Sequence, residues 1–107
     1  MPMPIENPYI IRCLYMRPGE QPRAEFLNGT ESQMETLLDG KIASVGIDDG
    51  ICAFYNAFSE VMQMPENRTI GNHTFYGPIL LVSYNATGDI FDLNDGDFAY
   101  YEDLLKL

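Results

Sequence analysis

Basic side chains are scarce in this 107-residue chain. Six Lys and Arg stand against sixteen Asp and Glu, which gives a net charge of −10 at pH 7. A field of this sign repels the phosphate backbone of a nucleic acid, because nucleic-acid binding depends on cationic side chains. We therefore expect no direct contact with DNA or RNA, and we expect any protein partner to present a basic surface.

Long hydrophobic runs are absent as well. A membrane-spanning helix needs about 20 consecutive apolar residues, and no run in the chain approaches that length. The first residues, MPMPIENPYIIR, lack the basic and continuous apolar regions of a signal peptide. We therefore expect a cytoplasmic protein that does not enter a membrane.

Residues with catalytic or metal-binding chemistry are few. His73 is the single histidine, and no serine or cysteine near it stands in the sequence context of a nucleophile. Cys13 and Cys52 lie in apolar runs, which predicts buried thiols, with a disulfide between neighbouring strands as the alternative. The aspartates from 89 to 97 resemble a calcium loop, but their spacing is one residue short. We predict no catalytic residue, no metal and no cofactor, and hence no enzyme.

The remaining composition is that of an ordinary globular domain. Asp49-Gly50 lies between two strand-like runs, and this dipeptide strongly favours a hairpin of residues 42–47 with 51–55. Further strands are predicted at 9–17, 23–27, 79–84 and 89–93, and helices at 31–38 and 98–107. Residues 57–64 are predicted to form a helical turn or a loop whose Phe58, Val61 and Met62 reach back to the core, and residues 64–68 to form a polar loop.

These elements predict an α+β fold, with a single mixed or antiparallel sheet of four to six strands and two helices on one face. Residues 1–8 contain three prolines and are expected to form a flexible lead-in, followed by one domain over 9–107.

Several short motifs together resemble a known family. They are Asp48-Asp49-Gly50, the strand that ends at Asn56, Pro65-x-Asn67-Arg68, the strand with Gly77-x-x-Leu80, and the helix that follows Asp97. This order is similar to a domain family of unknown function, made of short proteins from bacteriophages, plasmids and Gram-positive bacteria. The likeness covers the chain from about Tyr9 to its end. It implies an accessory protein of a mobile element and brings no catalytic residue or cofactor.

Two hypotheses for function follow. In the first, the protein binds and inhibits a basic host protein by mimicking nucleic-acid charge. The residues predicted to contact this partner are Asp89, Asp92, Asp95, Asp97, Glu102 and Asp103. In the second, the protein binds a small anionic, nucleotide-like ligand around Asn67 and Arg68. The residues predicted for that site are Asn56, Asn67, Arg68, His73 and Tyr76.

Arg68 has two interpretations. Its planar cation with five donors suits a carboxylate or phosphate of a ligand. It also suits a structural clamp that bonds backbone carbonyls, or an acid such as Asp48 or Asp49, and the sequence favours the clamp.

Overall fold

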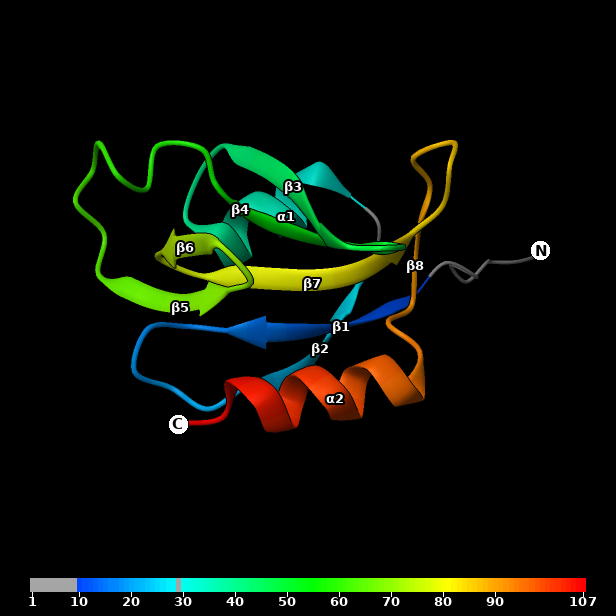
Figure 1. The fold of residues 1–107 in the computed structure, drawn as a ribbon. Helices are drawn as coiled ribbons and strands as arrows, with labels where there is room; N and C mark the ends of the chain where they lie inside the picture. Colours follow the sequence, from blue (N-terminus) through cyan, green and yellow to red (C-terminus); the bar gives the residue numbers. More distant parts are fainter. Residues whose placement is uncertain (1–9, 29) are drawn as a thin grey trace.

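The computed structural model describes residues 10–28 and 30–107 (Figure 1). The predicted lead-in, residues 1–8, lies outside the described residues. Along the chain the elements are β1 (Ile11–Met16), β2 (Arg23–Leu27), α1 (Glu31–Leu38), β3 (Ile42–Asp48), β4 (Ile51–Asn56), β5 (Glu66–Ile70), β6 (His73–Tyr76), β7 (Ile79–Tyr84), β8 (Ile90–Phe91) and α2 (Asp95–Leu105).

The main sheet has six strands in the order β2-β1-β7-β4-β3, and β8 pairs with the end of β7. All of its pairings are antiparallel. This confirms the α+β class and the six-stranded antiparallel sheet. The hairpin predicted around Asp49-Gly50 is confirmed too, since β3 and β4 pair from Ile42 opposite Asn56 to Asp48 opposite Ile51.

The three central strands are apolar on both faces, because consecutive side chains along a strand point to opposite sides. On β1, Leu14 and Met16 belong to one buried cluster, whereas Cys13 and Tyr15 belong to another. The same alternation separates Ile79 and Leu81 from Leu80 and Val82 on β7. The sheet therefore lies between two hydrophobic cores.

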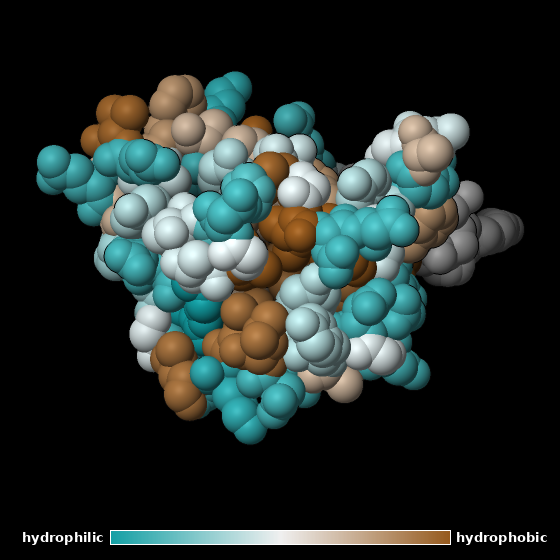
Figure 2. All heavy atoms as spheres, in the orientation of Figure 1, coloured by the Kyte–Doolittle hydropathy of each residue, from teal (hydrophilic) through white to brown (hydrophobic). Residues whose placement is uncertain are grey.

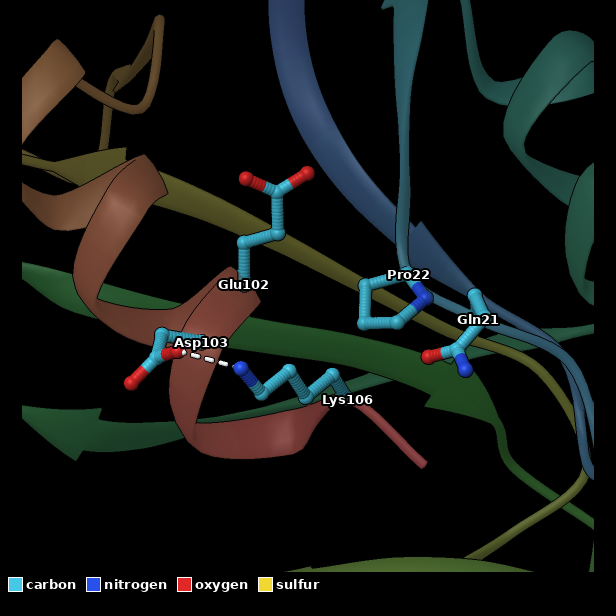
Figure 3. Close-up of a pocket in the computed structure, with 5 residues that line it drawn as sticks. All are labelled: Gln21, Pro22, Glu102, Asp103 and Lys106. Carbon is cyan, nitrogen blue, oxygen red and sulfur yellow. Dashed lines mark ion pairs between the residues drawn. The ribbon is translucent and has the colours of Figure 1, made fainter.

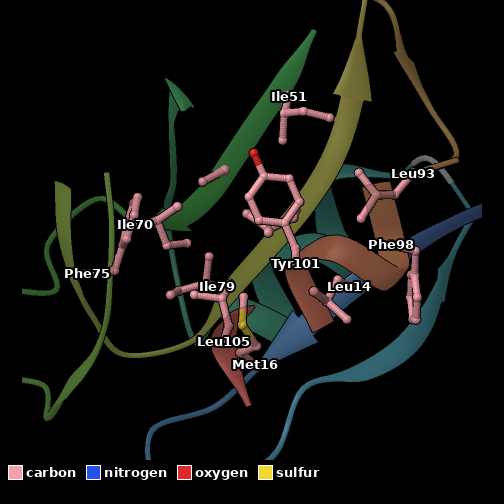
Figure 4. Packing of buried hydrophobic residues seen from close by; sticks show 12 residues of the cluster. Leu14, Met16, Ile51, Ile70, Phe75, Ile79, Leu93, Phe98, Tyr101 and Leu105 are labelled. Atoms are coloured by element: carbon pink, nitrogen blue, oxygen red, sulfur yellow. The ribbon is translucent and has the colours of Figure 1, made fainter. Parts of the chain in front are cut away.

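The two helices cover different cores. Met34 and Leu38 of α1 pack in the cluster that contains Cys13. Phe98, Tyr101 and Leu105 of α2 pack in the cluster that contains Leu14 (Figure 4). The prediction of two helices on one face was therefore wrong. The apolar stripe of each helix was visible in the sequence, but no local pattern specifies the face of the sheet on which a helix docks.

Both helices begin at capped positions. The Thr30 side chain accepts a hydrogen bond from the Gln33 amide, and the Asn94 side chain accepts one from the Asp97 amide at 2.9 Å. Capped by Asn94, α2 begins at Asp95, three residues before the predicted start. The acids in its first turn suit the positive end of the helix dipole. No helix among the described residues is long and apolar enough to cross a membrane.

A second, two-stranded sheet was missed by the sequence analysis. β5 and β6 form an antiparallel hairpin, with Ile70 opposite His73. Its inward side chains are Arg68, Ile70 and Phe75, all buried. Because one inward position of β5 is an arginine, the usual alternation of apolar and polar residues is hidden, and the segment reads as a polar loop.

Both cysteines are buried free thiols. Burial, with Glu25 adding to it, raises the pKa of Cys13 to about 12, and burial raises the pKa of Cys52 to about 11. Their strands β1 and β4 are separated by β7, so the disulfide between neighbouring strands that the sequence left open is not formed.

We expect iodoacetamide at pH 8 to label neither cysteine in the native protein, because the reactive thiolate is disfavoured by burial. After denaturation without reductant, intact-mass spectrometry should show two additions. An unlabelled species two hydrogens lighter than the reduced protein would contradict the free-thiol assignment.

Candidate functional site

The five residues predicted for a small-ligand site separate into two groups. Asn56, Asn67 and Arg68 hold the backbone of the protein itself. His73 and Tyr76 line a cavity whose lining includes none of these three residues. The sequence therefore named residues of two different environments as one site.

Arg68 is 7% exposed and bonds to four oxygens of the protein. Its Nε donates to the carbonyl of Leu105 at 3.0 Å, and its Nη2 donates to the carbonyl of Glu20 at 2.7 Å. Its Nη1 donates to the carbonyl of Arg17 and to the side-chain oxygen of Asn67. Burial lowers the pKa of Arg68.

These contacts are those of the structural clamp, made with carbonyl oxygens rather than with the suggested Asp48 or Asp49. Among the described residues, Arg68 forms no ion pair. The Leu105 carbonyl lies at the negative end of the α2 dipole, which supplies partial negative charge to the guanidinium. Arg68 thereby joins β5, the β1–β2 loop and the end of α2.

The two asparagines complete backbone contacts in the same way. Asn67 donates to the carbonyls of Met16 and Gly77, at 3.0 and 2.7 Å. Asn56 is 1% exposed, donates to the carbonyls of Leu38 and Asp39, and accepts from the amide of Phe58. Each side-chain amide group joins two segments through hydrogen bonds, so few of its donors and acceptors are available to a ligand.

The cavity with His73 and Tyr76, here called the hairpin cavity, lies between β4, β6 and the loop that joins β4 to β5. Its volume is about 270 Å³. Tyr55 and Phe75 stand edge to face in its wall, with ring centroids 5.4 Å apart. Ser59, Glu60, His73 and Tyr76 add polar groups. Ser59 and His73 are not hydrogen-bonded to each other in the described structure, so they form no nucleophile and base pair there.

The loop over 57–65 carries apolar side chains outward. Phe58, Val61 and Met62 are 52%, 82% and 58% exposed, so the prediction that they reach the core was wrong. Figure 2 shows apolar atoms at the corner where this loop protrudes in Figure 1. The inward positions are taken by Asn56 and Ser59, because Asn56 anchors the start of the loop to the end of α1.

A second cavity, of about 320 Å³, lies beside the end of α2 (Figure 3). Two of the predicted partner-binding residues, Glu102 and Asp103, line it with Gln21 and Lys106. Asp103 pairs with Lys106 at 2.9 Å, and Gln21 bonds to both backbone polar groups of Leu107. Most of the polar groups in this cavity are therefore bonded to the protein.

The remaining predicted partner-binding residues lie at the opposite end of α2, at what we call the acidic end of the sheet. Here the β3–β4 turn meets the β7–β8 turn, since the Tyr84 amide donates to the Gly50 carbonyl. The Tyr101 hydroxyl donates to Asp48, which joins this turn to α2. Figure 1 shows the β3–β4 turn, the β7–β8 turn and the start of α2 at the same end of the sheet. The acids in and beside these segments are Asp48, Asp49, Asp89, Asp92, Asp95 and Asp97.

Arg12 is also at the acidic end, although its partners there are 80 and 83 residues away in sequence. Its guanidinium pairs with Asp95 at 2.8 Å and lies over the Phe98 ring. Its backbone amide donates to Asp92 at 2.8 Å. This contact brings a basic residue to the acids, and it joins segments that are distant in sequence. Of the six residues predicted as one surface, Glu102 and Asp103 stand roughly 10 to 12 Å further along the helix axis than Asp95.

We expect Arg68→Ala to lower the free energy of unfolding by about 1 to 3 kcal/mol, because the carbonyls that it satisfies would lose a charged donor. Urea denaturation measures this change. Lys41→Ala removes the same charge from an exposed position and should change stability by less than about 0.5 kcal/mol. Equal stability of Arg68→Ala and the unsubstituted protein would contradict the clamp.

The family comparison agrees with the resemblance noted in the sequence. Searches against curated proteins and against solved structures find no significant match. One family model, described as a domain of unknown function (DUF3846), matches residues 11–106. This range extends from β1 to the residue after α2, so it includes the clamp, the hairpin cavity and the acidic end. The chain therefore belongs to the DUF3846 family of domains of unknown function.

Proposed function

We propose that this protein is a non-catalytic binding protein whose acidic end contacts a basic surface on a protein partner. The observation that carries the proposal is the distribution of charge. The fold collects carboxylates from the β3–β4 turn, the β7–β8 turn and the start of α2 at one end of the sheet. In the described chain, Asp48, Asp49, Asp89 and Asp97 form no ion pair there.

The positive charges are largely used within the protein. Arg17 pairs with Asp39 at 3.0 Å, Arg23 lies near Glu20 and Glu25, and Lys106 pairs with Asp103. Arg68 is buried against carbonyls. The surface that remains for a partner is therefore dominated by carboxylates, which raise the rate of association with a basic surface and suppress binding to an acidic one.

The proposal that the protein performs no chemistry has support in the positions of its nucleophiles. Cys13 and Cys52 belong to the core under α1, whereas His73 lies beside Phe75 on the α2 side. Burial raises the pKa of both thiols, to about 12 and about 11, so the nucleophilic thiolate is disfavoured. A cysteine and histidine pair would need these groups to meet.

The biological setting is part of the proposal and rests on the resemblance described above. In this view the protein is a cytoplasmic accessory protein of a phage or mobile element, and it inhibits a basic host protein by occupying that protein's cationic surface. Membrane contact and direct nucleic-acid binding are not part of this role, since the net charge of −10 opposes association with anionic phosphates.

The alternative of a nucleotide-like ligand at Asn67 and Arg68 is less well supported. Arg68 makes four hydrogen bonds to the protein, and the Asn67 amide group donates to two carbonyls. An anionic ligand would have to displace these contacts from a side chain that is 7% exposed.

The test compares two double variants that change the net charge equally. Asp49→Lys with Asp89→Lys reverses two exposed acids of the acidic end, and Glu35→Lys with Glu66→Lys reverses acids on α1 and β5. The partner is captured from a host extract at low salt on the unsubstituted protein, and its affinity for each variant is then measured by calorimetry. Thermal melting establishes that both variants are folded.

We expect the first variant to bind the partner at least about tenfold more weakly, and the second to change affinity by less than about threefold. Binding of the unsubstituted protein should also weaken as salt is raised from 50 to about 300 mM, because exposed charges are screened. Equal losses in the two variants would show that net charge alone matters. Unchanged binding of the first variant would remove the acidic end from the interface.

A further inference from the structure

We propose that the hairpin cavity binds an organic cation, namely the guanidinium or alkylammonium group of an arginine-like or lysine-like molecule. The cavity is lined by residues from four segments: Val45 on β3, Tyr55 on β4, Ser59 and Glu60 in the following loop, and residues 73–76 on β6. It is separate from the acidic end, and the inference does not depend on the partner proposed above.

Ser59 is the first observation that points to a ligand. Ser59 is 4% exposed and lines the cavity, and its hydroxyl forms no hydrogen bond within the described structure. No side-chain nitrogen or oxygen among the described residues is both buried and without a partner, so the Ser59 hydroxyl is open to the cavity. A donor that enters the cavity would satisfy the lone pairs of the Ser59 oxygen.

The other polar groups around the cavity are available in the same way. Among the described residues, the side chains of Tyr55, Glu60, His73 and Tyr76 make no hydrogen bond or ion pair with the protein. This differs from the cavity beside α2, where Asp103, Lys106 and Gln21 are already bonded. The hairpin cavity therefore combines the Ser59 hydroxyl, which is open to the cavity, with several other polar groups that are not bonded to the protein.

The charge and the walls of the cavity select a cation. Glu60 is the only Asp, Glu, Lys or Arg among the described residues that line it, and the protein as a whole carries −10. Tyr55, Phe75 and Tyr76 supply aromatic surface, and a ring face attracts a cation through its quadrupole. The edge-to-face contact of Tyr55 with Phe75 holds two of these rings in place.

The size of the cavity restricts the ligand. Its volume of about 270 Å³ is below the range of roughly 300 to 1,000 Å³ that holds drug-sized ligands. A nucleotide exceeds this space and has the wrong charge, whereas a guanidinium or ammonium group on a short alkyl chain fits both conditions. Such a group can come from a free diamine or from an Arg or Lys side chain of another protein.

The direct test is a titration of the isotope-labelled protein, followed by NMR, with agmatine and with butylamine. Butyrate and butanol serve as anionic and neutral probes of similar size. We expect both cations to shift the amide signals of Ser59, Glu60 and residues 73–76, and the two control molecules to leave them in place. Shifts that are absent, spread over the whole chain, or equal for butanol would overturn the proposal.

Glu60→Gln and Glu66→Gln form a matched pair, since each removes one exposed carboxylate and only Glu60 lines the cavity. We expect Glu60→Gln to weaken agmatine binding about tenfold and Glu66→Gln to change it by less than about twofold. Equal affinities for the two variants would refute the role of Glu60. Ser59→Ala should also weaken agmatine binding if the variant folds. If it does not fold, the comparison of Glu60→Gln with Glu66→Gln decides whether the cavity binds the cation.

The source of the cation is tested with the capped peptide Ac-Ala-Arg-Ala-amide. Tighter binding of this peptide than of agmatine would assign the cavity to a side chain of a partner protein. Tighter binding of agmatine would assign it to a free amine. Both results support a cation site, and failure of both probes to bind would exclude it while leaving the acidic end unaffected.

Discussion

The fold depends on three strands, β1, β7 and β4, that bury side chains on both of their faces. Leu14, Leu81 and Ala53 are fully buried on one side, and Cys13 and Leu80 are fully buried on the other. Each large aliphatic side chain removed from water contributes about 1.5 to 3 kcal/mol. A sheet of this kind is stable only when both faces are covered, and the chain meets this requirement with α1 on one face and α2 with the β5–β6 hairpin on the other.

Covering the second face requires a polar connection in the interior. The β5–β6 hairpin is short, and a two-stranded hairpin is marginally stable by itself. Asn67 and Arg68 attach it to β1, to the β1–β2 loop and to the end of α2 through carbonyl oxygens. Because the guanidinium is buried, its hydrogen bonds are strong and their geometry is specific. The same attachment holds β6 opposite Tyr55 and so creates the hairpin cavity.

The two proposed binding regions act through different physical interactions. The acidic end is exposed and acts through long-range electrostatics, whose strength depends on salt. The hairpin cavity is partly enclosed and acts through aromatic surface, the Ser59 hydroxyl and one carboxylate. Both favour positive charge, so a basic protein with a projecting arginine or lysine is chemically compatible with both regions.

Local sequence patterns determined the elements whose signals are short-range. Asp49-Gly50 specified the β3–β4 hairpin, Thr30 capped α1, and the apolar runs located β1 and β7. The family resemblance also came from local motifs. The clamp was the favoured interpretation of Arg68, because an isolated arginine in an acidic chain needs acceptors. Its carbonyl partners could not be named, since Leu105 and Glu20 are 37 and 48 residues away in sequence.

Only the tertiary structure decided the relations between distant segments. The periodicity within α1 or α2 does not specify which face of the sheet the helix covers. Ion pairing between Arg12 and Asp95 joins residues that are 83 positions apart. In the loop after β4, the sequence predicts that apolar residues point inward, and the anchoring of Asn56 to α1 turns Phe58 and Val61 outward and Ser59 inward.

The sequence by itself determined where strands, turns and caps form, because those depend on neighbouring residues. Which charges meet, which side chains are buried and where cavities open were decided by tertiary contacts, because these depend on how remote segments pack.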